Sequence, residues 1–202
     1  MRRRLLKIGD PQARKAIASL RRGHVAIDCG ANVGNVTALF AARHADVHAF
    51  EPNPTAYPFL SKRFADVPDV ECTPAAVTLA DGTAKLYLHR NAGSDPLKWS
   101  AGSSLYADKG NVDPDAAVEV RTIDLSRFIA SLDRPVQVLK LDIEGAEIEV
   151  LGGLLDTGQL HQIPHVLVEM HDNKIPSLER PGAELRARLR AERLDNVLLD
   201  WI

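Results

Sequence analysis

Three things are scarce in this sequence: cysteine, long apolar runs and net charge. Cys29 and Cys72 are its only cysteines, so we expect two reduced thiols in a cytoplasmic protein. No apolar run approaches the roughly 18 residues that cross a membrane, and the basic residues 2–4 are not followed by the apolar core of a signal peptide. We therefore expect a cytoplasmic protein without a membrane partner.

The charge and the composition restrict the class of protein further. A formal net charge of -2 at pH 7 and a pI near 6.4 give no general attraction to nucleic acid. The 202 residues, 45% hydrophobic and 26% charged, match one globular domain with its own core. We expect a single domain over residues 1–202 that does not bind nucleic acid, and the oligomeric state stays open.

Residues 1–23 are expected to contain an N-terminal helix. Asp10 suits the cap, Pro11 the first helical position and Gly23 the end. Basic side chains gather before this helix and on its outer face, at Arg2, Arg3, Arg4, Lys7, Arg14, Lys15, Arg21 and Arg22. They form either a solvated surface or a contact for an anionic partner.

A short apolar stretch that leads into a glycine turn is the most informative part of the sequence. Residues 25–27 suit a buried strand, Gly30 and Gly34 permit close approaches that a side chain would block, and residues 36–43 are typical of a helix. A strand, a glycine turn and a helix form a nucleotide-cofactor site, with the ligand outside the carboxyl end of the strand. The alternative is a turn that only connects the two elements.

The order of residues in this turn favours one cofactor over another. A dinucleotide turn requires G-x-G-x-x-G, whereas Asn32 stands in place of the middle glycine. Asp28 precedes the first glycine, where it would repel a pyrophosphate and attract the ammonium group of an amino acid. Both features favour S-adenosylmethionine, with Asp28 orienting its methionyl end. The turn residues expected at this cofactor are Asp28, Gly30, Ala31, Asn32, Val33 and Gly34.

A second carboxylate follows at the spacing expected for a ribose ligand. Residues 47–51 are typical of a strand, and Glu51 ends it about 20 residues beyond the turn, where doubly wound folds place the acid that hydrogen-bonds ribose hydroxyls. The alternative for Glu51 is a solvated acid at a strand end.

Several motifs together resemble the FkbM group of class I methyltransferases. They are Asp28-x-Gly30-Ala31-Asn32-x-Gly34-x-x-Thr37, Phe50-Glu51-Pro52-x-Pro54, Ser103-Ser104, Lys140-x-Asp142-x-Glu144-Gly145-Ala146-Glu147 and Glu169-x-His171. They follow the family order, and the block from Lys140 to Glu147 is the most specific. The resemblance implies a Rossmann-like sheet, S-adenosylmethionine as methyl donor, and a hydroxyl group on a sugar, glycolipid or polyketide as acceptor. It adds Thr37 and Pro52 to the residues expected at the cofactor.

Two segments in the middle of the chain carry further expectations. The resemblance places adenine near the loops after the second and third strands, so Ala75, Ala76 and Val77 are expected either on its apolar face or in the core. The pair Asp81-Gly82 between residues 75–79 and 84–89 predicts a β-hairpin.

Residues 91–117 are rich in Gly, Ser, Asp and Pro and predict a long loop. A loop of this length inside a compact domain is usually functional or disordered. We expect a lid over the acceptor that carries Ser103 and Ser104, with Trp99 and Tyr106 stacking on a sugar or ring. A mobile surface loop without ligand contact is the alternative.

The candidate acid-base groups stand near the ends of two later strands. Residues 136–141 are typical of a buried central strand, and Asp142 follows at the switch point where donor and acceptor should meet. Methyl transfer is an in-line displacement, so the site must align the acceptor oxygen, exclude water and accept a proton. His171 ends the next strand and titrates near neutral pH, which suits a general base; a hydrogen bond to a neighbouring loop is the alternative. The candidate catalytic residues are Lys140, Asp142, Glu144 and His171.

Oxygen ligands near the same strand ends allow a metal ion. Asp142 at one strand end, with Asp172 and Asn173 at the next, could hold Mg²⁺ in the manner of catechol-type O-methyltransferases and lower the pKa of the acceptor hydroxyl. Aspartate and asparagine also favour strand-end turns for local reasons, which is the alternative.

The C-terminal part is short for a class I methyltransferase. Residues 182–194 predict a helix and residues 197–202 one last strand, whereas this class generally ends with an antiparallel pair. We expect an α/β fold with a Rossmann-like, mostly parallel, doubly wound sheet that is shortened at its C-terminal edge. The expected function is S-adenosylmethionine-dependent O-methylation of a small metabolite, sugar, glycolipid or polyketide. The alternatives are an NAD(P)-dependent oxidoreductase and a catalytically inactive S-adenosylmethionine-binding subunit.

Overall fold

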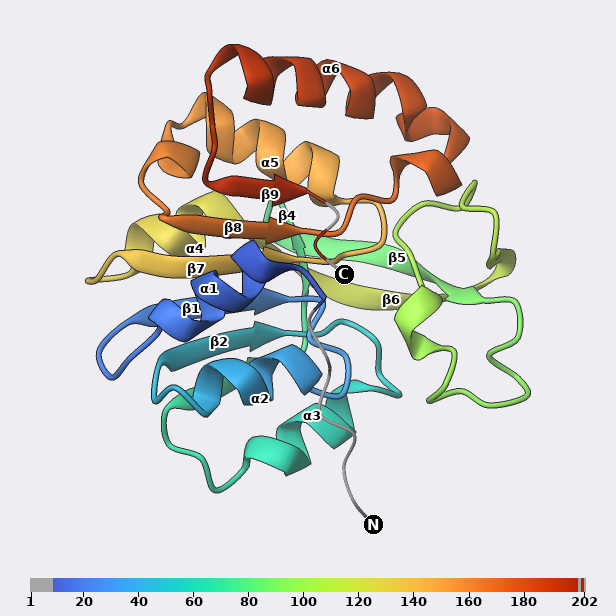
Figure 1. Ribbon diagram of the computed structural model, residues 1–202. Coiled ribbons are helices and arrows are strands. Elements are labelled where there is room, and N and C mark those ends of the chain that lie inside the picture. Colours follow the sequence, from blue (N-terminus) through green and yellow to red (C-terminus); the bar gives the residue numbers. More distant parts are fainter. Residues whose placement is uncertain (1–8, 200, 202) are drawn as a thin grey trace.

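The computed structural model describes residues 9–199 and 201 (Figure 1). The basic residues at positions 2, 3, 4 and 7, and two residues of the expected last strand, 200 and 202, lie outside the described residues. The described residues form a six-stranded sheet, a second sheet of three strands, and helices that cover the larger sheet. No helix among them has the length and apolarity needed to cross a membrane.

The six-stranded sheet confirms the expected parallel, doubly wound fold. Its strand order is β3-β2-β1-β7-β8-β9, and every neighbouring pair is parallel. The central strands are apolar almost throughout because helices cover both of their faces. The strands are β1 (Val25–Cys29), β2 (Asp46–Phe50), β3 (Val70–Thr73), β7 (Val136–Leu141), β8 (His165–Val168) and β9 (Val197–Leu199).

Helices pack on both faces of this sheet, and alternate residues of each strand face alternate layers. In β1, Ala26 faces the layer of α1 and α2, whereas Val25 and Ile27 face the layer of α5. The first layer contains α1 (Pro11–Ser19), α2 (Asn35–Ala41) and α3 (Tyr57–Phe64), and the second contains α4 (Leu125–Ser131), α5 (Glu147–Asp156) and α6 (Glu179–Ala191).

The start of α1 confirms the predicted cap. Asp10 accepts hydrogen bonds from the backbone N–H groups of Gln12 and Ala13 at 2.7 and 2.9 Å, and Pro11 occupies the first helical position. The helix packs through small and aliphatic residues against Ala26 of β1 and the buried Trp201. Trp201 therefore lies in the core of this chain.

The strand order of the second sheet shows that the predicted β-hairpin is wrong. β4 (Ala76–Thr78) pairs in parallel with β6 (Val112–Asp124), and β6 pairs antiparallel with β5 (Gly82–His89), so the order is β4-β6-β5. The reason lies at the predicted turn, where Asp81 accepts a hydrogen bond from Asp124 N at 3.0 Å and Ala80 O accepts one from Thr122 at 2.9 Å. These contacts tie the turn to β6, which separates the two strands expected to pair.

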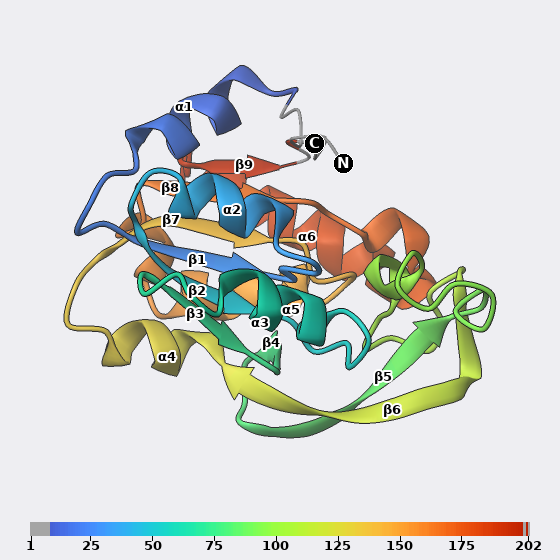
Figure 2. The same cartoon turned by 90° about the horizontal axis from the view of Figure 1, so that it is seen from below.

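The predicted loop is shorter than residues 91–117, because its last part belongs to β6. Val112 and Ala117 pair with His89 and Tyr87 of β5, and the register shift between these pairs accommodates Pro114 in the strand. The remaining segment, residues 90–111, contains a 3-10 helix at Ser100–Gly102. Figures 1 and 2 show this segment, with β5 and β6, at the carboxyl ends of the parallel strands. We call residues 90–111 the roof loop.

Candidate active site

The glycine turn after β1 packs tightly against its neighbours. Gly30 and Gly34 have positive φ angles of 75° and 80°, which side chains rarely adopt. A Cβ atom on Gly30 would lie 1.8 Å from the backbone oxygen of Asp142. The N–H groups of Gly30 and Ala31 both donate to Phe50 O, at 3.0 and 2.9 Å. The turn is therefore fixed between the ends of β2 and β7.

A cavity opens beside this turn at the carboxyl ends of the strands. It encloses about 590 Å³ when space open to solvent is counted. Among residues 9–199 and 201, those that line the wall include three carboxylates and neither lysine nor arginine. The lining residues are Gly30, Asn32, Glu51, Pro52, Asn53, Ala75, Ala76, Val77, Leu86, Ser100, Ala101, Ser103, Leu105, Asp142, Ile143 and Glu144.

Glu51 is held rigidly in the wall of this cavity. Its two carboxylate oxygens accept hydrogen bonds from the backbone N–H groups of Asn32 and Asn53, at 2.7 and 2.8 Å. Burial raises the pKa of Glu51 to about 7, although both hydrogen bonds oppose the shift. The side chain therefore presents fixed acceptor oxygens to a ligand.

The opposite part of the wall is apolar. Ala75, Ala76 and Val77 line it together with Leu86 and Leu105. The small alanine side chains leave room for a flat ring, and the valine and leucine side chains give that ring an apolar surface without hydrogen-bonding groups. The wall thus combines a hydrogen-bonding end at Glu51 with an apolar slot.

Asp28, Thr37 and Lys140 form a buried cluster behind the turn and do not line the cavity. Asp28 accepts a hydrogen bond from the Thr37 hydroxyl at 2.6 Å and lies 3.2 Å from the Lys140 ammonium group. The ammonium group also donates to the backbone oxygens of Cys29 and Gly30, at 3.1 and 2.8 Å. Burial alone lowers the pKa of Lys140, but the charges of Asp28 and Asp142 outweigh it and raise that pKa. Lys140 thus stays protonated and joins β7 to the glycine turn.

Other predicted turn residues serve packing. Ala31 is buried against Leu60 and Phe64, and a Cβ atom on Gly34 would lie 2.4 Å from the Phe64 ring. Val33 accepts a hydrogen bond from Arg63 through its backbone oxygen, at 2.8 Å. Of the predicted turn residues, Gly30 and Asn32 are the two that reach the cavity wall.

The roof loop is bonded to the cavity from above. Asn32 donates a side-chain hydrogen bond to Ser100 at 2.9 Å, and Asn53 donates one to Ser103 at 3.0 Å. The Ser104 hydroxyl donates to the backbone oxygen of Glu144 at 2.6 Å. These bonds come from both sides of the cavity, so the loop forms its cover. The Trp99 ring stacks on the His89 ring, with 4.4 Å between the ring centroids. One face of the Trp99 ring is therefore occupied by His89.

Four carboxylates surround His171, which is 1% exposed. Its Nδ1 lies 2.9 Å from Glu147, and its Nε2 lies 3.3, 3.6 and 3.9 Å from Glu144, Glu169 and Asp142. Burial alone lowers the pKa of His171, but the Glu147 hydrogen bond and the surrounding negative charges outweigh it and raise that pKa. The imidazole is therefore more basic than that of an exposed histidine.

Lys109 of the roof loop is the second cation at this point. Its ammonium group is buried and bonds to the carboxylate of Glu144 and, at 3.0 Å, to Gly102 O. Burial raises the pKa of Glu144, against the opposing charges of His171 and Lys109. Asp142 and Glu144 lie on the cavity wall, so this charged group borders the cofactor space.

The oxygen set expected for Mg²⁺ is not assembled as predicted. The carboxylate of Asp172 is bonded to Arg186 by both oxygens, one of them at 3.0 Å. Metal-ligating atoms converge within 4.8 Å of one another on Asp142, Glu144 and His171, and Asp172 is not among them. The 3-10 helix after β8, Asp172–Lys174, is thus joined to α6 through this ion pair.

The cavity and its charges suit one cofactor class better than another. A dinucleotide would place its pyrophosphate beside Glu51 or Asp142 without any cationic lining residue to neutralise it. A nucleoside with an amino-acid end carries no phosphate, so its binding does not place a negatively charged phosphate beside these carboxylates. A family model described as a methyltransferase FkbM domain matches residues 28–196. The chain belongs to the FkbM methyltransferase family.

Two curated relatives agree with the FkbM assignment. The chain is 27% identical over 145 residues to the hexuronic acid methyltransferase AglP of Haloferax volcanii, a match that covers 71% of this chain and 54% of AglP. It is 29% identical over 193 residues to the methyltransferase sdnD of Sordaria araneosa, which covers 83% of this chain and 73% of sdnD. The chain thus spans about half of AglP and about three quarters of sdnD.

A solved structure named as an rRNA methylase, from Clostridium thermocellum, matches 90% of this chain and 82% of its own, at 12% identity and a TM-score of 0.47. The assignment of the α/β fold rests on the strand order described above.

Sequence reasoning missed two residues of this FkbM site. Glu147 was part of the matching block but had no assigned role, and its carboxylate accepts hydrogen bonds from the N–H groups of Ile143 and Gly145, at 2.8 and 2.9 Å, as well as contacting His171. Its position near a strand end, between Glu144 and a helix, was the available signal. Lys109 gave no signal, because it reaches Glu144 only through the path of the roof loop.

Proposed function

We propose that this FkbM protein is an S-adenosylmethionine-dependent methyltransferase that methylates a hydroxyl oxygen. The observation that carries the proposal is the cavity wall, which combines the fixed carboxylate of Glu51 with an apolar slot and, in the described part of the chain, contains no lysine or arginine. Glu51 accepts hydrogen bonds from the ribose hydroxyls. Ala75, Ala76 and Val77 contact the adenine.

The methionyl end lies toward Asp142 and Glu144 in this proposal. Asp28 does not orient it directly, because Thr37 and Lys140 occupy that carboxylate behind the turn. Asp142 and Glu144 border the cavity where the sulfonium would lie, and their negative charges favour a cation there. Gly30 and Asn32 supply backbone and amide contacts along the turn.

The acceptor reacts beside the same carboxylates. A lone pair of the acceptor oxygen attacks the methyl carbon, the carbon–sulfur bonding pair returns to sulfur, and neutral S-adenosylhomocysteine leaves. The hydroxyl proton passes to the group of Asp142, Glu144 and His171, which also aligns the oxygen. The roof loop excludes water while this happens.

The acceptor is proposed to be a small molecule or a glycan. The name of one relative, a hexuronic acid methyltransferase, supports a sugar. A polyketide or another small metabolite with a hydroxyl group fits the same chemistry, because the reaction needs only an oxygen that can reach the methyl group.

Calorimetric titration tests this proposal, with S-adenosylhomocysteine and NAD⁺ as separate ligands. We expect S-adenosylhomocysteine to bind and NAD⁺ not to bind. Glu51→Ala should weaken the first interaction at least tenfold, whereas Glu71→Ala, at an exposed strand position, should not. Binding of NAD⁺ alone, or equal affinity in the Glu51→Ala variant, would overturn the proposal.

A further inference from the structure

We infer that Asp142, Glu144 and His171 bind a divalent cation at the acceptor side of the cavity. Each residue offers one ligand atom, and these atoms lie within 4.8 Å of one another. The inference rests on the proposed function only for what the ion does, not for whether it binds.

The spacing of the three atoms fits one central ion. Ions with oxygen and nitrogen ligands at about 2.0–2.3 Å place neighbouring ligands about 3 Å apart and opposite ligands at most about 4.6 Å apart. His171 Nε2 lies 3.3 Å from Glu144 Oε2 and 3.9 Å from Asp142 Oδ1, inside that interval. An ion between them would share Glu144 Oε2 with the Lys109 ammonium group.

The imidazole is an independent sign of a ligand, beyond the carboxylates. His171 is 1% exposed, and Glu147 fixes its orientation through Nδ1 at 2.9 Å. Its Nε2 points into the cluster, where it faces the carboxylates of Glu144, Glu169 and Asp142 at 3.3, 3.6 and 3.9 Å. Metal-binding histidines commonly have this arrangement, with one ring nitrogen on a carboxylate and the other free for the ion.

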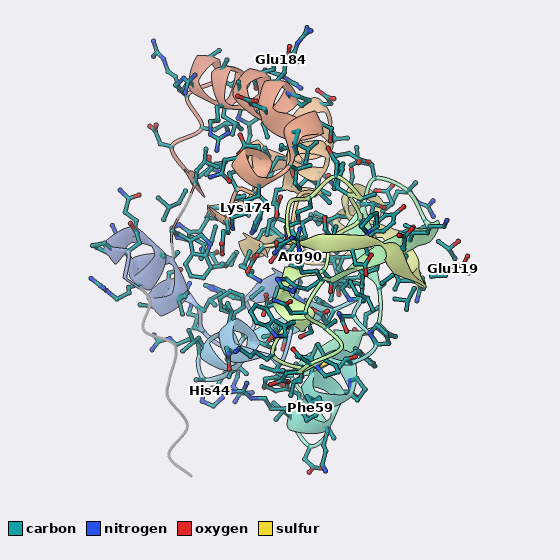
Figure 3. All side chains as sticks on the ribbon, turned by 90° about the vertical axis from the view of Figure 1, so that its right-hand side faces the viewer. His44, Phe59, Arg90, Glu119, Lys174 and Glu184 are labelled. Carbon is teal, nitrogen blue, oxygen red and sulfur yellow. The ribbon has the colours of Figure 1, made fainter. Side chains whose placement is uncertain are left out.

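The charge around the imidazole favours a cation of more than one charge. The carboxylates of Asp142, Glu144, Glu147 and Glu169 face it. Lys109 lies on Glu144, Lys174 acts on Glu169 from the outer surface (Figure 3), and Lys140 is shared between Asp28 and Asp142. The four carboxylates therefore outnumber the two lysines, Lys109 and Lys174, that interact with this group and are not shared with Asp28. A divalent ion bound at Nε2 would add positive charge among these carboxylates.

The ligand types select among metals. Carboxylates suit Mg²⁺ and Mn²⁺, and an imidazole nitrogen shifts the preference from Mg²⁺ toward Mn²⁺. Three protein ligands leave about three of six positions for water or substrate. Asp142 and Glu144 also line the cavity, so these open positions face the transferred methyl group.

This position defines the class of acceptor. An ion with adjacent open positions binds two neighbouring oxygens, such as those of a vicinal diol or a 2-hydroxy acid, and lowers the pKa of the hydroxyl that reacts. The acceptor of this protein should therefore carry a second oxygen next to the methylated one. Glu169 lies beside the cluster, 3.6 Å from His171 Nε2, where it can receive the proton that the metal-bound hydroxyl releases.

Electron paramagnetic resonance of Mn²⁺ tests the site without requiring an acceptor. Titration of the metal-free full chain with MnCl₂ should remove the free-ion signal with one Mn²⁺ per chain. Asp142→Asn, at a partly exposed position, should weaken binding at least tenfold, and His171→Gln should do the same. Glu149→Gln removes an equal charge from an exposed position of α5 and should leave the affinity unchanged.

The outcomes separate this inference from the proposed function. No Mn²⁺ binding by the wild type, or equal loss in Glu149→Gln and Asp142→Asn, would overturn the metal site. Calorimetry with S-adenosylhomocysteine on the same metal-free protein is the second arm. If that ligand binds and Mn²⁺ does not, the metal site is wrong and the methyltransferase proposal stands. If Mn²⁺ binds and S-adenosylhomocysteine does not, the reverse holds.

Discussion

Two buried charge clusters lie close to the end of β7. They differ in how far positive and negative charges balance, and in how far they are exposed to the cavity. Behind the glycine turn, Asp28 is matched by Lys140 and the Thr37 hydroxyl, and all three are sealed from solvent. Around His171, carboxylates outnumber cations, and Asp142 and Glu144 keep 25% and 21% of their side chains exposed toward the cavity. A balanced, closed cluster stabilises a fold, whereas an unbalanced, open one leaves charge for a ligand.

The largest effect should come from breaking the balanced cluster. Lys140→Met leaves Asp28 as a buried charge without an opposite charge beside it, which costs about 3–5 kcal/mol of unfolding free energy. Urea unfolding measures this loss, and Lys85→Met at an exposed position of β5 is the control. A loss below about 1 kcal/mol for Lys140→Met would remove the distinction between the two clusters.

Breaking the open cluster should affect turnover and leave the fold intact. His171→Gln is expected to lower kcat about 100-fold or more, equivalent to about 2.7 kcal/mol, with S-adenosylhomocysteine affinity within a factor of about two of the wild type. His161→Gln, at a half-exposed position, is the control for steady-state kinetics and calorimetry. Equal turnover in the two variants would show that His171 is structural.

Glu51 sharpens the comparison through pH, because it is a third buried carboxylate and it faces the ligand. Its pKa is raised to about 7, so it is largely protonated at pH 6 and largely ionised at pH 8. The ionised form accepts hydrogen bonds from both ribose hydroxyls. The affinity for S-adenosylhomocysteine should therefore rise up to about tenfold from pH 6 to pH 8. Calorimetry at both pH values measures this, and Glu51→Gln should flatten the dependence. A fall in affinity with rising pH would contradict the assignment.

The smallest effect should come from an exposed ion pair, which sets the baseline for the buried ones. Arg127 lies 3.0 Å from Asp81, and both side chains are at least half exposed. Solvent screens such a pair, so Arg127→Ala should change the unfolding free energy by less than about 1 kcal/mol. Urea unfolding checks this; a larger loss would mean that exposed charges also matter for stability here.

The sequence predicted what depends on local pattern. The glycine turn, the cap at Asp10 and the carboxylate of Glu51 follow from residues close together in the chain, and the structure places them as expected. The parallel pairing of β4 with β6 depends on segments about 45 residues apart, as in Val77 with Ile123, which local turn signals cannot reveal.

The same reason explains why some predicted site residues make other contacts in the structure than the sequence indicated. Asp28 and Lys140 have the residue types of a catalytic site, yet they face each other behind the turn, and only three-dimensional packing decides that direction. Asp172 has the type of a metal ligand, but an arginine on α6 occupies it. Residue type was visible in the sequence; the partner of each charge was not.

The contact between Gly30 and Asp142 has a consequence for how this protein can change over time. The missing side chain at Gly30 leaves the space that the Asp142 backbone fills, so a larger residue there would push Asp142 aside. A substitution that altered the choice of cofactor at this point would at once disturb the handling of the acceptor. Mutational drift, or an engineer seeking new substrates, therefore has more freedom at the apolar slot and the roof loop, where one requirement can change without the other.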